Sequence, residues 1–154
     1  MDENTLISAS LSRAMALCSG REYCIADIRS KLQLWGVGEA DSGKIISTLV
    51  RENFINEKRY SQAFARDKFR YNKWGRIRIR AELKMKKIPE EIISETLSSL
   101  DENLYREILR NLLESHRKSI KSKNLYDLKG KLLRYGSSKG FESDLLYDIL
   151  SGLE

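Results

Sequence analysis

Aromatic and basic side chains alternate along residues 60–76, a pattern that suits contact with a polyanion. The aromatics are Tyr60, Phe64, Phe69, Tyr71 and Trp74, and basic residues stand at positions 66, 68, 70, 73 and 76. Two interpretations compete: the aromatic rings stack on nucleic-acid bases while the cations contact phosphates, or the rings form the core stripe of a helix. We expect Tyr60, Phe64 and Phe69 in the core and the cations outside. For Trp74 both interpretations remain, since it precedes a glycine at a predicted turn.

The positive charge of the chain is concentrated around this pattern. Residues 57–87 contain 12 basic and three acidic residues, a net charge of +9, whereas the whole chain carries +6. Each phosphate that such a segment neutralises releases condensed counterions, which favours binding to a polyanion. The alternative is a solvated helix face that only confers solubility.

Residues that support catalysis are scarce. His116 is the single histidine and has no cysteine or acidic residue near it in the sequence at ligand spacing apart from Glu114, and Cys18 and Cys24 lack the paired spacing of a zinc site. The glycines of residues 36–38 and the Ser-Gly-Lys of residues 42–44 do not match a phosphate-binding loop. We therefore expect no catalytic residue, no metal site and no cofactor.

The composition excludes several classes of protein. The 154 residues are 41% apolar and 32% charged, which is too apolar for a disordered chain. No apolar run approaches the roughly 18 residues of a transmembrane helix, and the acidic start does not resemble a secretory signal. Two cysteines cannot form a disulfide framework, so we expect a cytoplasmic protein.

The apolar residues follow a helical period over most of the chain. Residues 101–120 carry an i, i+4, i+8 stripe behind Asp101, a predicted N-cap. Pro89 predicts a helix start, Asn124 predicts a second N-cap, and Gly136 predicts the end of the helix that Asn124 begins. The alternation of Ile and Arg over residues 76–80 permits an edge strand, but we reject it because helical spacing continues through residue 86 and no partner strand exists.

An internal repeat predicts the architecture. Residues 28–32, 79–83 and 128–132 each have an aliphatic residue, a basic residue and then leucine at the fifth position, and each precedes a turn and an aliphatic pair. The leucines are about 50 residues apart, and another helix is predicted before each segment. The expected fold class is all-α, with three three-helix units at 1–55, 56–100 and 101–154 in an elongated, curved array.

At the middle unit the sequence resembles the RecX family of regulatory proteins. The resemblance covers residues 19–100 well and is weak after residue 104. Its central pattern reads Tyr60-x-x-x-Phe64-x-Arg66-Asp67-Lys68-Phe69-x-x-Asn72-Lys73-Trp74-Gly75-Arg76-Ile77-x-Ile79-x-x-Glu82-Leu83-x-x-Lys86-x-Ile88. It is an aromatic and basic helix, a glycine turn and a second basic helix.

The resemblance implies a non-enzymatic protein that binds the groove of the RecA–DNA filament, and we expect it to be a monomer. Such a protein would inhibit the recombinase, ATPase and coprotease activities of RecA. The candidate residues for contact with the partner or with phosphate are Arg66, Lys68, Arg70, Lys73, Trp74, Arg76, Arg78, Arg80 and Lys84. The charge pattern alone also permits a stand-alone protein that binds single- or double-stranded DNA, and nothing favours an enzyme.

Overall fold

The protein folds entirely into helices over residues 2–153, the part that the computed structural model describes. The helices are α1 (Glu3–Gly20), α2 (Ile25–Leu34), α3 (Glu39–Arg51), α4 (Glu57–Asn72), α5 (Arg76–Met85), α6 (Glu90–Ser98), α7 (Glu102–Arg117), α8 (Leu125–Ser138) and α9 (Ser143–Ser151). Within these bounds there is no strand, and residues 76–80 begin α5. The prediction of an all-α fold is confirmed.

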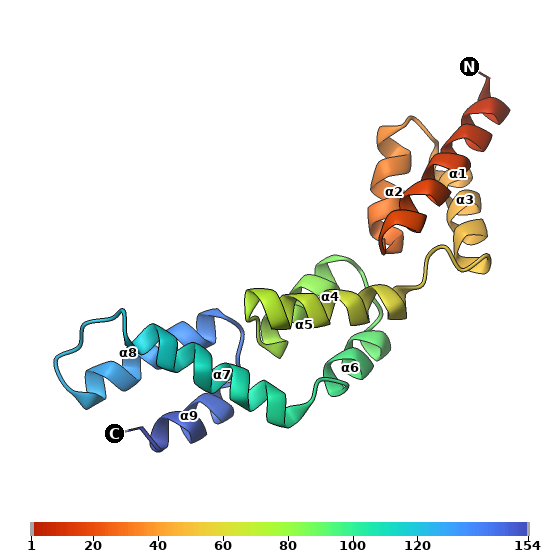
Figure 1. The fold of residues 1–154 in the computed structure, drawn as a ribbon. Coiled ribbons are helices and arrows are strands. Elements are labelled where there is room, and N and C mark those ends of the chain that lie inside the picture. The colour runs from red at the N-terminus through yellow and green to blue at the C-terminus, as the bar shows by residue number, and fades with distance from the viewer. Residues whose placement is uncertain (1, 154) are drawn as a thin grey trace.

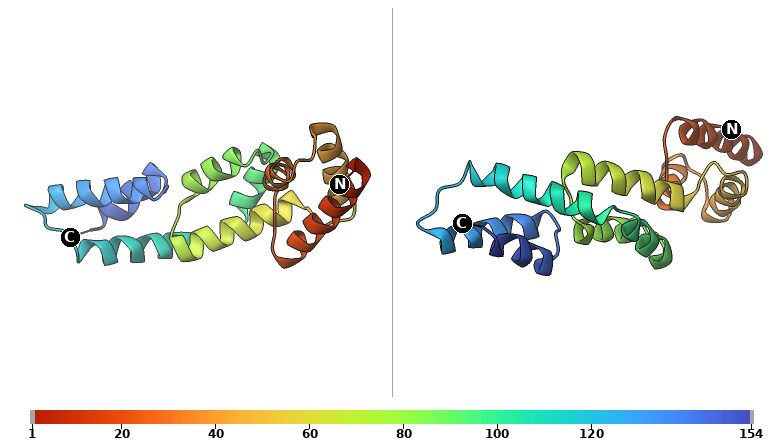
Figure 2. Two further views of the ribbon diagram at one scale, coloured as in Figure 1. Left: turned by 90° about the horizontal axis from the view of Figure 1, so that it is seen from above. Right: turned by 60° about the horizontal axis from the view of Figure 1, so that its bottom comes forward.

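Successive groups of three helices follow one another along an elongated molecule. Helices α1–α3 form unit 1, α4–α6 unit 2 and α7–α9 unit 3, with the N-terminal end at the unit 1 extremity and the C-terminal end in unit 3 (Figures 1 and 2). Unit 1 is set at an angle to the other two (Figure 1). We propose unit boundaries at 55/56 and 100/101, because both points lie in connections between helices.

The repeated sequence positions occupy equivalent places in the three units. The aliphatic residue and leucine of each repeat lie on the middle helix of a unit and are buried: Ile28 and Leu32 on α2, Ile79 and Leu83 on α5, and Leu128 and Leu132 on α8. A spacing of four residues puts both on one helix face, so each middle helix turns the same face inward.

Side-chain caps begin several helices where the sequence predicts them. The Asp101 carboxylate accepts a hydrogen bond from Asn103 N at 2.9 Å, and Asn124 Oδ1 accepts one from Asp127 N at 2.8 Å. These bonds satisfy N–H groups that have no partner within a helix. Pro89 occupies the N-cap of α6.

The predicted helix end at Gly136 is wrong. Helix α8 continues to Ser138, and the left-handed turn falls at Gly140, where φ is +94°. Gly136 is buried against α9, and a Cβ there would lie 2.4 Å from Leu146 Cδ2. Close packing between helices, rather than a turn, therefore explains this glycine.

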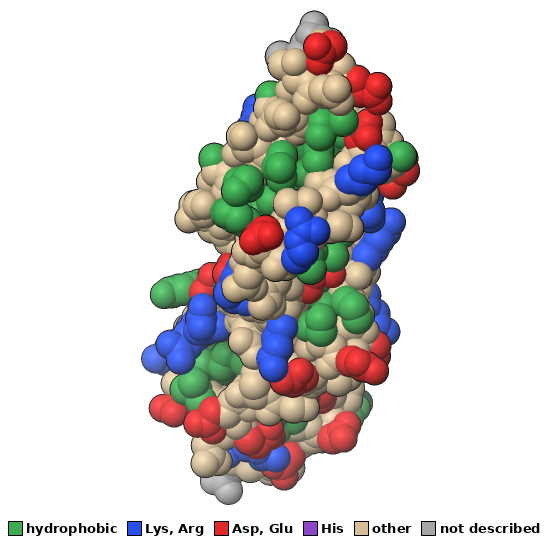
Figure 3. Space-filling view, turned by 90° about the vertical axis from the view of Figure 1, so that its right-hand side faces the viewer, with side chains coloured by type: hydrophobic (Ala, Val, Ile, Leu, Met, Phe, Trp, Pro, Cys, Tyr) green, Lys and Arg blue, Asp and Glu red, His purple; other side chains and the backbone are tan. Residues whose placement is uncertain are grey.

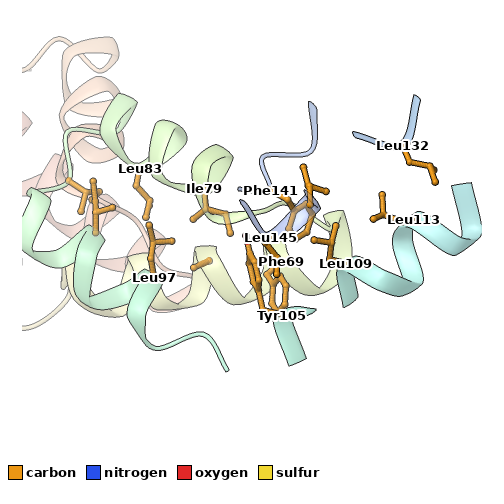
Figure 4. Close-up of a cluster of buried hydrophobic side chains, with 14 of the residues drawn as sticks. Phe69, Ile79, Leu83, Leu97, Tyr105, Leu109, Leu113, Leu132, Phe141 and Leu145 are labelled. Carbon is orange, nitrogen blue, oxygen red and sulfur yellow. The ribbon is translucent and has the colours of Figure 1, made fainter. Parts of the chain in front are cut away.

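The apolar core consists of two clusters. Unit 1 has its own, which contains Ile28, Leu32 and Leu49 among others. Units 2 and 3 share the second, in which the Tyr105 ring of α7 lies 5.4 Å from the ring of Phe69 and 5.1 Å from that of Phe141, between centroids. Figure 4 shows these rings midway along a row of buried side chains that runs from Leu83 to Leu132. Units 2 and 3 are thus joined by apolar packing.

Polar contacts dominate the junction between units 1 and 2. Lys86 Nζ lies 2.6 Å from Asp27 Oδ1, Arg59 forms an ion pair with Glu22, and Ile25 N donates to Glu57 Oε2 at 3.2 Å. Buried Cys24 is the contribution of the unit 1 side to the shared core, with Ala26 packed against it. The first unit is therefore attached mainly by charged groups.

Candidate polyanion-binding surface

Helix α4 turns its basic side chains toward two sides of unit 2. Exposed Arg66 and Arg70 are one helical turn apart and line a groove with Leu104. Lys68 lies about 200° from Arg66 around the helix axis, because each residue turns the helix by about 100°. It lines another groove, which faces unit 1. The basic side chains of α4 therefore lie on two different surfaces of unit 2.

Trp74 lies between two cations in the turn from α4 to α5. Lys68 Nζ is 5.1 Å from the centroid of the indole ring, and Arg78 Cζ is 4.1 Å from it. Cations at this distance are attracted by the negative ring face. The Phe64 ring meets the indole edge-on at 6.3 Å between centroids. The indole thus fixes the position of two charges that face away from the core.

Phe64 departs from the prediction that it is a core residue. Tyr60 and Phe69 are buried, as predicted, whereas Phe64 is only partly buried. Its ring lies 5.6 Å from Lys68 Nζ. Phe64 therefore supports the Lys68 and Trp74 arrangement from the edge of the core.

Lys139 joins this group from unit 3, which the sequence did not indicate. Its Nζ donates to the carbonyl oxygen of Asn72 at 2.8 Å, at the C-terminal end of α4. Burial and the positive charge of Arg78 lower the pKa of Lys139. We call Lys68, Trp74, Arg78 and Lys139 the Trp74 cluster.

Two glycines make this meeting of units possible. Gly75 N donates to the carbonyl oxygen of Lys139 at 2.8 Å, and Ile77 N donates to that of Gly140 at 3.0 Å. A Cβ on Gly75 would lie 2.3 Å from Gly140 O, and one on Gly140 would lie 2.4 Å from Arg78 Cβ. The two turns approach at backbone distance, which places Lys139 next to Arg78.

Arg76 is a structural residue in this structure rather than an open contact. Its guanidinium donates to Glu142 at 2.8 Å and to Glu102 at 2.6 Å, lies 3.8 Å from the Tyr105 ring centroid, and leaves its side chain 20% exposed. Burial disfavours the charge, but the hydrogen bonds to Glu142 and Glu102 outweigh it and raise the pKa of Arg76. Its charge is therefore compensated within the molecule.

The remaining candidates are also engaged to different degrees. Arg80 forms an ion pair with Glu90, and Lys84 Nζ lies 3.8 Å from the same carboxylate. Lys73 has φ +57° and ends α4, and its Nζ donates to the carbonyl oxygen of Arg70. Exposed ion pairs such as these are weak and open to exchange with a partner.

The nine predicted residues thus do not form one continuous surface. Figure 3 shows one face of the molecule, on which Lys and Arg side chains lie among Asp and Glu side chains. Within residues 2–153, no carboxylate forms an ion pair with any cation of the Trp74 cluster. This cluster therefore combines cations that form no ion pair with an aromatic ring.

The residues considered for catalysis lie apart and in inert surroundings. His116 stacks on Tyr135 with 3.6 Å between ring centroids. Burial raises the pKa of the Cys24 thiol to about 11, so the reactive thiolate is disfavoured. The described chain holds no group of three or more His, Cys, Asp or Glu side chains arranged for a metal, and none of its helices is long and apolar enough to cross a membrane.

Comparisons with known proteins place the chain among its relatives. A family model described as "RecX, second three-helix domain" matches residues 56–97. "Regulatory protein RecX" of Clostridium beijerinckii is 32% identical over 126 residues, which are 80% of this chain and 58% of that protein. The protein of the same name in Chlorobaculum tepidum is 29% identical over 150 residues, which cover 97% and 91% of the two chains.

Solved structures share the whole architecture. The crystal structure of RecX from Lactobacillus salivarius superposes with a TM-score of 0.85 at 24% identity and covers 97% of both chains. A second crystal structure, of a regulatory protein RecX, gives a TM-score of 0.87 at 20% identity over 97% of this chain and 73% of that one. These likenesses concern the fold. The chain spans 58% of the length of the Clostridium relatives.

Proposed function

Because this chain belongs to the RecX family of regulatory proteins, we propose that it binds the RecA–DNA filament and inhibits RecA. It acts in the cytoplasm as a non-enzymatic monomer that lies along the filament groove. There it limits the recombinase, ATPase and coprotease activities of RecA during DNA repair.

The Trp74 cluster carries this proposal. Two cations without carboxylate partners, Lys68 and Arg78, lie against one indole at the junction between units 2 and 3, and Lys139 adds a third charge close to Arg78. A cluster of cations without ion-pair partners attracts acidic side chains or phosphates of a larger assembly. This attraction offsets the free-energy cost of removing water from the cations. The elongated arrangement of the units gives the cluster a long neighbouring surface on either side (Figure 2).

A titration of the protein into RecA filaments on single-stranded DNA tests the proposal. We expect the rate of ATP hydrolysis to fall with the wild-type protein. The double variant Lys68→Glu and Arg78→Glu should need about tenfold more protein for the same inhibition, because two attractive contacts become repulsive.

A matched control removes the same charge elsewhere. Lys44→Glu with Arg51→Glu changes two exposed cations of unit 1 and should inhibit like the wild type. An unchanged ATPase rate at a stoichiometric excess of wild-type protein would refute the function. Equal potency of the two double variants, with equal circular dichroism, would refute the role of the Trp74 cluster.

The charge of residues 57–87 supports a second candidate, direct binding of DNA by unit 2 without RecA. With about six phosphate contacts, the logarithm of the affinity should fall against the logarithm of the salt concentration with a slope near −5. A negligible slope, or affinity that survives Lys68→Glu with Arg78→Glu, excludes this candidate.

A further inference from the structure

A second basic segment lies in unit 3. Residues 117–139 contain eight basic residues and one acidic residue, a net charge of +7. The chain outside this segment and residues 57–87 carries a net charge of −10. Unit 3 therefore offers its own site of attraction for anions.

A groove between α8 and α9 lies within reach of this charge. Its volume is about 470 Å³. Its lining combines apolar and aromatic side chains with two cations and one carboxylate: Tyr126, Asp127, Lys129, Leu133, Arg134, Tyr147 and Leu150. Tyr126 is 89% exposed and Tyr147 62% exposed, so both rings are open to a ligand.

The floor of the groove is kept open by a glycine. Gly130 lies in the interior of α8, where glycine costs about 1 kcal/mol relative to alanine. A Cβ there would meet Arg134 Nη1 at 3.7 Å, an ordinary contact. Packing within the chain therefore does not require this glycine, and its effect is to widen the groove.

The two cations of the groove have no carboxylate in direct contact. Among the described residues, neither Lys129 nor Arg134 forms an ion pair; the Asp127 carboxylate pairs with Lys131 Nζ at 3.3 Å and acts on Arg134 only through its charge at longer range. Exposed rings beside free cations are the combination that binds unpaired bases and their phosphates together. A duplex would hide its base faces from the rings, and an acidic peptide would leave the rings unused.

We propose that the α8–α9 groove binds single-stranded DNA. The rings of Tyr126 and Tyr147 stack on bases, and Lys129 and Arg134 contact the backbone phosphates. The choice of DNA over RNA rests on the proposed function at a RecA–DNA filament, but the binding itself requires no RecA.

Fluorescence anisotropy with a labelled 12-nucleotide oligo(dT), without RecA, tests this site. Replacing both Tyr126 and Tyr147 by alanine should weaken binding at least about 20-fold, since loss of each stack costs about fivefold or more. Replacing both by phenylalanine should retain the affinity, because the ring faces remain.

Three controls separate the groove from other causes. Leu34→Ala changes an exposed apolar side chain of unit 1 and should bind like the wild type. Lys68→Glu with Arg78→Glu should retain most of the groove binding. A strand of abasic deoxyribose phosphates of equal length should bind the wild type as weakly as oligo(dT) binds the alanine double variant.

Several results would overturn the proposal. They are equal affinity of the wild type and the folded alanine double variant, equal affinity for the abasic strand, and tighter binding of oligo(U) than of oligo(dT). An alanine double variant that binds oligo(dT) normally but no longer inhibits RecA would mean that the groove receives a protein. Failure of RecA inhibition with intact groove binding would instead refute only the function proposed above.

Discussion

At the scale of single residues, Tyr105 links the backbone of one unit to the side chains of the next. Its hydroxyl accepts a hydrogen bond from Arg76 N at 2.9 Å and donates one to Glu142. Burial, together with Glu142, raises the pKa of this hydroxyl, so it stays protonated and able to donate. The hydroxyl thus supplies the cap that the Gly75 N-cap of α5 lacks.

Replacing Tyr105 by phenylalanine should lower the free energy of unfolding by about 1–3 kcal/mol. The ring would remain, but Arg76 N would lose its acceptor in a partly buried place. Urea denaturation measures the change. Tyr71→Phe, whose hydroxyl is on an 80% exposed side chain, serves as the control and should change stability by less than about 0.5 kcal/mol.

Residue patterns indicated part of the candidate site. The basic and aromatic residues of 60–76 pointed to the Trp74 region, because their alternation can be seen within one short segment of the sequence. Lys139 could not be found in this way, since it lies far from Arg78 in the sequence and is brought next to it by the close approach of the Gly75 and Gly140 turns. The net charge of a segment also does not reveal that Glu102 and Glu142, which lie outside it, form ion pairs with Arg76.

At the scale of elements, the Gly75–Gly140 approach holds the α4–α5 turn against the α8–α9 turn. Gly75→Ala should destabilise the protein by about 1–3 kcal/mol, because the new Cβ would collide with backbone atoms that cannot rotate away. Thermal or urea denaturation measures the loss.

Gly38 offers a matched control for this substitution. It is also an N-cap with negative φ, and a Cβ there would meet no atom within 4 Å. Gly38→Ala should therefore cost only the loss of a better N-cap residue, up to about 1 kcal/mol, and less than Gly75→Ala. If both variants lose the same stability, the close approach does not constrain the junction.

The helices themselves were predictable from spacing alone. An aliphatic residue and a leucine four positions apart mark the buried face of α2, α5 and α8. This pair is buried in all three units. Gly136 misled because a glycine needed for contact with Leu146 has the same sequence signature as one that ends a helix. Only the packing of α8 on α9 distinguishes the two.

At the scale of the whole molecule, the junction between units 1 and 2 depends on ionised groups. Burial would raise the pKa of Asp27, but the hydrogen bond from Lys86 and its charge outweigh burial and hold the pKa below its ordinary value of 3.8. The ionised form is therefore favoured by folding. Its contribution to stability is complete above pH 3.8 and is lost as the pH falls through the lower pKa of the folded state.

Asp27→Asn should cost about 1 kcal/mol at pH 6, since the Asp27 side chain is only 15% exposed but its partner Lys86 is 43% exposed, so that water screens the pair in part. The difference in unfolding free energy between this variant and the wild type should shrink as the pH falls below about 3.8. Asp144→Asn, at an exposed position of α9, should give a small difference at every pH. A cost for Asp27→Asn that stays constant between pH 6 and pH 2.5 would contradict this account.

The division of the core has a mechanical consequence. Because units 2 and 3 are fused through Phe69, Tyr105 and Phe141 while unit 1 is held mainly by exchangeable ion pairs, stiffness is unevenly distributed along the chain. We expect units 2 and 3 to move as one rigid body and unit 1 to rotate relative to them near residues 21–27 and 52–59. A ligand of variable pitch can thus be followed by rotation of one end, without repacking the other.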